Sequence, residues 1–230
     1  MKMKTLILFM AMTVAAAAAT AEELFFPSKV GTVLIYKTFD KKNKETNTVK
    51  YTIKDVKTEG DNMDITYVCE STDEKNESVF KDELTLKKKG DKIYFDMSNL
   101  LNKAAFKQTG DVPADIQVTG NNLEVPANPK PGDVLPDATV TMAMSMGFMT
   151  MKMSAEVTNR KVESIETMTV KAGTFRCYKF SGTIQSTTMG IKLKTSTLDW
   201  YAKGIGTVRT ESYDKNGKLQ SYTELTEIKQ

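Results

Sequence analysis

The sequence contains no histidine, and this absence removes several kinds of catalytic centre. Without imidazole, neither a Ser-His-Asp triad nor a Cys-His pair can form, and most catalytic zinc sites lose their usual ligand. No glycine-rich phosphate loop occurs, because Gly204-Ile205-Gly206 precedes an expected strand rather than a helix. We therefore expect a protein that is not an enzyme, with no catalytic residue and no cofactor. A hydrolase that works through carboxylates alone stays as an alternative, since Asp and Glu are plentiful.

Cysteine is almost as scarce, with Cys69 and Cys177 as the only two. Two thiolates are too few for a four-cysteine zinc site. In an oxidising compartment they could form a disulfide bond, or they could stay reduced and pack as small apolar side chains. Both alternatives stay open, because a bridge depends on a Cα separation that the fold decides.

Long apolar runs are absent beyond the first residues. Two lysines precede a short apolar stretch, and Ala19-Thr20-Ala21 forms a small-x-small cleavage site. This order predicts a secretory signal peptide over residues 1–21 and a mature chain that begins at Glu22. A membrane anchor is the alternative, but the stretch is shorter than the roughly 20 strongly apolar residues of a spanning helix. We expect no transmembrane helix in the mature chain, and no lipid anchor, since no cysteine lies near the cleavage site.

A strong net charge of either sign is also absent. Lys2 and Lys4 leave with the leader, so the 32 basic and 29 acidic residues of the full chain become 30 and 29, a net charge of +1. Such a balance provides no field that would attract nucleic acid or an anionic membrane surface. We expect an exported protein of the periplasm or cell envelope that has no nucleic-acid partner.

The mature chain does contain a regular alternation of apolar and polar residues. Val49, Tyr51 and Ile53 alternate with Lys50 and Thr52, and this period of two recurs along the chain. It predicts an all-β protein, a curved antiparallel meander sheet or open barrel, in a single domain over residues 22–230. Turn sequences divide the pattern into about eleven expected strands: 30–39, 45–57, 62–72, 77–88, 91–96, 137–146, 149–167, 168–184, 186–200, 205–213 and 218–228.

Two segments depart from the alternation. Residues 98–106 predict one short helix that Ser98 would cap. A connector over residues 122–136 contains four prolines, which exclude a central strand because proline cannot donate to the ladder. The connector either wraps the sheet or separates two halves, and we expect a belt across one domain.

A run of methionines is the most unusual local feature. Thioether sulfur is a soft ligand that suits Cu(I), so the run is a candidate metal site. The alternative is an adaptable apolar face or groove lining, because methionine is unbranched and flexible, and we favour it. A tight turn at Gly147-Phe148 would bring two alternating rows together. The six residues are Met142, Met144, Met146, Met149, Met151 and Met153.

A second cluster surrounds Trp200, the only tryptophan, which is followed by Tyr201. Aromatic side chains can stack on sugars, so a glycan site is one interpretation. The other is that Trp200 or Tyr201 anchors a strand end against the core, while Gly204 and Gly206 shape a bend. We favour the anchor, because tryptophan is usually well buried.

The same part of the chain resembles a family of exported bacterial proteins of unknown function. The resemblance lies in Val170-Lys171-Ala172-Gly173-Thr174-Phe175, in Asp199-Trp200-Tyr201-Ala202-Lys203-Gly204, in the hairpin over 213–218 and in Phe26-Pro27. The family is the TapB-like group, and the resemblance implies a β-rich, YmcC-like fold. It implies no activity and no catalytic residues, and the methionine run lies outside the motif.

These observations favour a non-catalytic binding or structural module whose curved sheet presents an apolar groove. The expected partner is a lipid, a glycan or another envelope protein. Soft-metal binding through the methionine run is the alternative from a different class.

Overall fold

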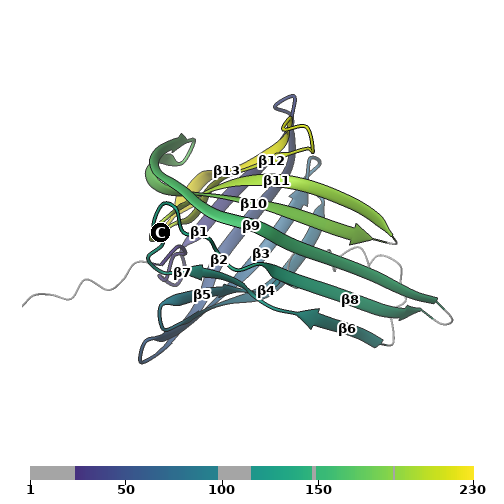
Figure 1. Cartoon of the computed structure of the whole chain (residues 1–230). Coiled ribbons are helices and arrows are strands. Elements are labelled where there is room, and N and C mark those ends of the chain that lie inside the picture. The colour runs from purple at the N-terminus through teal and green to yellow at the C-terminus, as the bar shows by residue number, and fades with distance from the viewer. Residues whose placement is uncertain (1–23, 98–114, 147–148, 189) are drawn as a thin grey trace, which may run out of the picture.

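The computed structural model describes residues 24–97, 115–146, 149–188 and 190–230, which form one open antiparallel sheet (Figure 1). The all-β prediction is confirmed, with thirteen strands rather than eleven. The expected helix at 98–106 lies outside the described residues. The strands are β1 (Val33–Asp40), β2 (Glu45–Glu59), β3 (Asn62–Asp73), β4 (Ser78–Lys89), β5 (Lys92–Phe95), β6 (Asp115–Gly120), β7 (Leu123–Pro126), β8 (Ala138–Met146), β9 (Met149–Val170), β10 (Gly173–Thr188), β11 (Ile191–Ala202), β12 (Gly206–Tyr213) and β13 (Leu219–Lys229).

The strand order shows how the two ends of the chain pair within the sheet. Along the sheet it is β6-β8-β9-β10-β11-β12-β13-β1-β2-β3-β4-β5-β7. The first and last strands of the chain, β1 and β13, therefore pair in the middle of the sheet. The two edges, β6 and β7, follow each other directly in the sequence. Figure 1 shows the sheet curving so that the long strands β8 to β11 and the strands β2 to β4 form its two sides.

Three of the hairpin turns use the same local device. In each, an aspartate at the end of a strand accepts hydrogen bonds from backbone N–H groups two and four residues later, as Asp40 does from Lys42 and Lys44 at 2.8 and 2.9 Å. A residue with positive φ then completes the turn, a conformation that Asn and Gly adopt most readily. The device recurs at Asp73 and Asp214, with positive φ at Asn43, Asn76 and Gly217.

The proline-rich connector runs across the sheet as a belt. Its first part is the short edge strand β7, which pairs with β5. Beyond β7, Leu135 donates its N–H to the carbonyl of Arg160 at 2.9 Å, and Val162 donates to the carbonyl of Asp133 at 2.9 Å. The Arg160 guanidinium donates to the carbonyls of Pro136 at 2.6 Å and Glu124 at 2.9 Å. Arg160 on β9 thereby holds β7 and the belt together.

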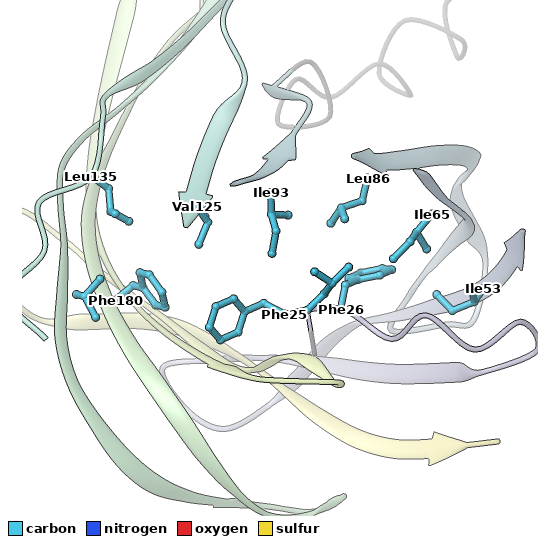
Figure 2. Close-up of a cluster of buried hydrophobic side chains, with 11 residues drawn as sticks. Phe25, Phe26, Ile53, Ile65, Leu86, Ile93, Val125, Leu135 and Phe180 are labelled. Carbon is cyan, nitrogen blue, oxygen red and sulfur yellow. The ribbon is translucent and has the colours of Figure 1, made fainter. Parts of the chain in front are cut away.

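The central core forms around a segment that precedes the first strand. Phe25 and Phe26 lie between side chains that reach inward from strands on both sides (Figure 2). The Phe25 ring makes edge contacts with Tyr178 and Phe180, at centroid distances of 5.1 and 6.2 Å. The backbone is fixed as well, because the Gly204 N–H donates to the carbonyl of Leu24 at 2.6 Å. We call the sheet face that packs against these two phenylalanines the inner face.

Candidate ligand-binding face

The two rows of methionines lie side by side on β8 and β9. The antiparallel register sets Met142 opposite Met153, Met144 opposite Met151 and Met146 opposite Met149. The two rows are brought together as expected, and the expected turn at Gly147-Phe148 lies outside the described residues. Directly opposed residues share one face of a sheet, so the register places Met142, Met144, Met151 and Met153 on one face.

Several of these methionines are packed. Met142 and Met144 are buried in a cluster with Met97, Val140 and Val157, and the half-buried Met151 and Met153 pack against it. The cluster lies on the inner face, because Val157 is opposite Ile184 on β10 and Ile184 alternates in step with Phe180. The methionine end and the phenylalanine end are thus two regions of one surface.

The apolar surface continues past the packed methionines to exposed side chains. The register links Val118, Met142, Met153, Thr188 and Ile191 in one row across five strands. A second row links Val140, Ala155, Ser186 and Leu193. At the margins Val118, Ile191 and Leu193 are 45%, 77% and 63% exposed. We call this surface the methionine face; it comprises Val118, Val140, Met142, Met144, Met151, Met153, Ala155, Val157, Ile184, Ile191 and Leu193.

This face has the chemistry of an adaptable apolar site. Methionine side chains repack at little cost, and contiguous exposed apolar side chains mark interaction sites. In the described ranges no group of three or more Cys, Asp or Glu is arranged to hold a metal ion. Thioethers are therefore the soft ligands that this face presents.

A polar group on the same face was not predicted from the sequence. Asp199 on β11 lies opposite Phe180 and accepts a hydrogen bond from the Thr210 hydroxyl at 2.7 Å. Burial raises the pKa of the Asp199 carboxyl, and hydrogen bonds from Thr210 and Thr197 and the charge of Arg160 act in the opposite direction. Arg160 is only 6% exposed. The sequence did contain a signal, because Asp199 and Tyr201 are two residues apart and therefore lie on the same face of the strand. That signal is useful only once the structure shows which face of the strand points inward.

A shallow hollow opens in the surface near this polar group. It is lined mainly by small polar side chains and glycines on β9, β10, β11 and the β12–β13 hairpin: Asn159, Ser181, Gly182, Thr183, Ser196, Thr197, Leu198, Tyr213 and Gly217.

Trp200 is a buried anchor rather than an open platform. Its ring packs against Cys177 and Val208, and its indole N–H donates to Glu166 at 2.8 Å. Lys179 lies over the ring at 5.0 Å from the centroid. These contacts hold the end of the β9–β10 hairpin against β11 and β12, and they support the anchor interpretation of the tryptophan.

The two cysteines occupy different parts of the sheet. Cys69 is on β3 and Cys177 is on β10, with five strands between them in the sheet order. Both are buried, free thiols, and burial raises the pKa of each to about 11. A disulfide between them stays a prediction.

In the part of the chain that the structure describes, no helix has the length and apolar character needed to span a membrane.

Comparison with known proteins identifies the family. A family model described as DUF3108-like matches residues 29–225. The chain belongs to the DUF3108-like family. No curated protein with a matching sequence was found.

Solved structures share the fold of this DUF3108-like chain. One is described as an exported protein with a YmcC-like fold from Bacteroides fragilis; it is 21% identical, with a TM-score of 0.74, and the match covers 90% of this chain and 100% of that one. Another, described as a lipoprotein from Parabacteroides distasonis, is 25% identical, with a TM-score of 0.75, and the match covers 90% of this chain and 99% of that one. The resemblance to exported proteins with a YmcC-like fold is confirmed.

Proposed function

We propose that this DUF3108-like protein is a non-catalytic binding module of the periplasm or cell envelope, and that its methionine face accepts the acyl chain of a lipid. The observation that carries the proposal is the register that joins two methionine rows to the exposed Ile191 and Leu193 on one concave face. Burying apolar side chains against an acyl chain supplies about 25 cal/mol per Å² of contact.

The shape of the sheet supports access from one side. Leu24, Phe25 and Phe26 occupy the inner face at the other end, where they pack among Ile53, Ile65 and neighbouring side chains. An apolar ligand would therefore meet the methionine face rather than the filled core.

The location follows from the leader and from the relatives. The order of residues 1–21 predicts export, and two solved relatives are described as an exported protein and a lipoprotein.

The test is binding of dodecylphosphocholine, below its micelle-forming concentration, to the mature chain by calorimetry. We expect the Ile191→Ser/Leu193→Ser double variant to lose affinity by about tenfold or more, because two apolar contacts are worth a few kcal/mol. Both side chains are exposed, so the fold should tolerate the change.

The matched control is Val79→Ser/Val134→Ser, which removes two exposed valines outside the methionine face. Its affinity should stay within about twofold of the parent chain, as expected for distant surface positions. No binding to the parent chain, or the same loss in both double variants, would contradict the proposal.

A soft-metal site is the second candidate, and the facing methionine pairs on β8 and β9 favour it. Cu(I) added to the reduced protein would raise the melting temperature of the parent chain but not that of Met142→Leu/Met144→Leu. An unchanged melting temperature in the parent chain would remove this candidate.

A further inference from the structure

A row of polar side chains crosses the inner face beside the methionine face. Its members lie directly opposite one another on six consecutive strands, and the first of them lies opposite Phe180, so they share the face of Phe180. The row consists of Asp199, Thr210, Thr223, Thr38, Asn47 and Asp73. A parallel row consists of Gly182, Thr197, Ser212, Ser221 and Asp40. We call the hydroxyl, amide and carboxyl groups of these two rows the hydroxyl ladder.

The hydroxyl ladder is linked by side-chain hydrogen bonds but is not saturated. The hydroxyls of Thr38 and Thr223 lie 2.9 Å apart, and the Asn47 amide donates to Ser71 at 2.8 Å. The carbonyl oxygen of Asn47 is buried and has no donor among the described residues. A buried acceptor without a donor is destabilising, so a hydroxyl group that donated to this oxygen would bind favourably.

The charges on the ladder favour a neutral ligand over an anionic one. Asp40 and Asp73, at the ladder's ends, already accept backbone N–H groups of the hairpin turns. Asp199 lies at the opposite end of its row from Asp73, beside Phe180, and it is half-buried with Thr210 as donor. The cation facing it is Arg160, whose guanidinium donates to two backbone carbonyls. A phosphate would meet carboxylates here, whereas a neutral polyol would meet acceptors and hydroxyls.

The ladder and the methionine face meet along β11. Its inward positions run from Ile191 and Leu193 through Thr195 to Thr197 and Asp199. At about 3.3 Å per residue, Leu193 and Asp199 are roughly 20 Å apart along the strand. One strand therefore changes from apolar to polar over the length of a medium acyl chain with a sugar attached.

We propose that the inner face binds a neutral glycolipid, with its acyl chain on the methionine face and its sugar hydroxyls on the hydroxyl ladder at Asp199 and Thr210. This inference rests on the proposed function and names its ligand class. Sugar hydroxyls are both donors and acceptors, and they match the carboxylate, amide and hydroxyl groups of the ladder. The ladder selects the headgroup, and the methionines bind the chain.

The experiment compares two amphiphiles with the same twelve-carbon chain on the mature protein. Dodecyl maltoside carries a neutral sugar and dodecylphosphocholine carries a phosphate, and both are kept below their micelle-forming concentrations. We expect dodecyl maltoside to bind about tenfold more tightly, the effect of one or two good hydrogen bonds.

Substitutions test whether the preference for dodecyl maltoside depends on the hydroxyl ladder. Asp199→Asn and Thr210→Val should reduce the preference for dodecyl maltoside to about threefold or less, with dodecylphosphocholine affinity unchanged, because these two side chains bind the sugar and lie outside the methionine face. Thr210→Ser keeps the hydroxyl and should retain the preference. Thr85→Val is the matched control, since Thr85 lies on the opposite face of β4 from the buried Leu86.

The outcomes separate the two proposals. Equal affinity for both amphiphiles, or a preference that survives Asp199→Asn and Thr210→Val, overturns the glycolipid assignment and leaves acyl-chain binding standing. Binding of neither amphiphile overturns the proposed function and the glycolipid assignment together.

Discussion

The two ends of the inner face use different kinds of apolar side chain. At one end Phe25 and Phe26 fill the space with rigid rings in defined edge contacts. At the other end the cluster is built from Met142, Met144 and their neighbours, and its margin is exposed. Rings pack in one arrangement, whereas thioether side chains repack. The difference indicates that the aromatic end is packed in one arrangement, whereas the methionine end can adjust its packing, which is what our proposal of ligand binding requires.

The largest expected effect tests the aromatic end. Phe25→Ala should reduce the free energy of unfolding by about 3–5 kcal/mol, because it leaves a cavity where a fully packed ring was. Chemical denaturation of the mature chain measures this. Val30→Ala, at an exposed position a few residues away, should change the free energy by less than about 0.5 kcal/mol. A small effect of Phe25→Ala would mean that the segment before β1 is dispensable.

The next effect concerns the link between the belt and β9. Arg160→Met should lower the free energy of unfolding by about 1.5–3 kcal/mol, because it removes the charged hydrogen bonds that the guanidinium donates. The two acceptors are the carbonyls of Pro136 and Glu124. Lys161→Met, at the exposed neighbouring position, is the control and should be nearly neutral. Equal stability of the two variants would show that the belt holds without the guanidinium.

A smaller effect is expected at the methionine end. Met144→Leu should cost less than about 1.5 kcal/mol, because the exchange conserves volume and the neighbouring methionines can adjust. Met144 is as deeply buried as Phe25, so a difference between the costs of Met144→Leu and Phe25→Ala does not come from a difference in exposure. A cost for Met144→Leu that matches Phe25→Ala would erase the contrast between the two ends.

The smallest effect appears as a dependence on pH. Burial raises the pKa of the Asp199 carboxyl in the folded protein, so the folded state holds this proton more tightly than the unfolded state. Stability from this group is fully present below the unfolded pKa and is lost as pH rises through the folded pKa. Asp199→Asn should flatten that part of the curve of unfolding free energy against pH, from about pH 4 upward. Parallel curves for both proteins would contradict the assignment.

The sheet was predictable because alternation is a local signal. The pattern at Val49, Tyr51 and Ile53 predicts a half-buried strand, and β2 contains it. Two boundaries were wrong by several residues. The strands expected at 149–167 and 168–184 are β9 and β10, which turn at Lys171 and Ala172, and the strand expected at 186–200 is β11, which begins at Ile191. An uninterrupted alternation does not show where a chain reverses, and here Gly173, with a φ of 144°, follows the turn.

Two strands and the core segment escaped prediction for a different reason. β6 and β7 are short, and β7 ends at Pro126, so neither offers a clear period. Leu24, Phe25 and Phe26 make no strand, and their burial depends on a cavity that distant strands create. The hydroxyl ladder also escaped prediction, because its members are one or two polar residues on each of six strands.

The sequence by itself determined the class of fold, the alternation of faces and the absence of imidazole chemistry, because each depends on residue type or on neighbours along the chain. The tertiary structure decided which strands became partners. Only that pairing sets Met142 against Met153 and Asp199 against Thr210. Register between strands comes from the packing of the whole inner face, and no local stretch of sequence contains it.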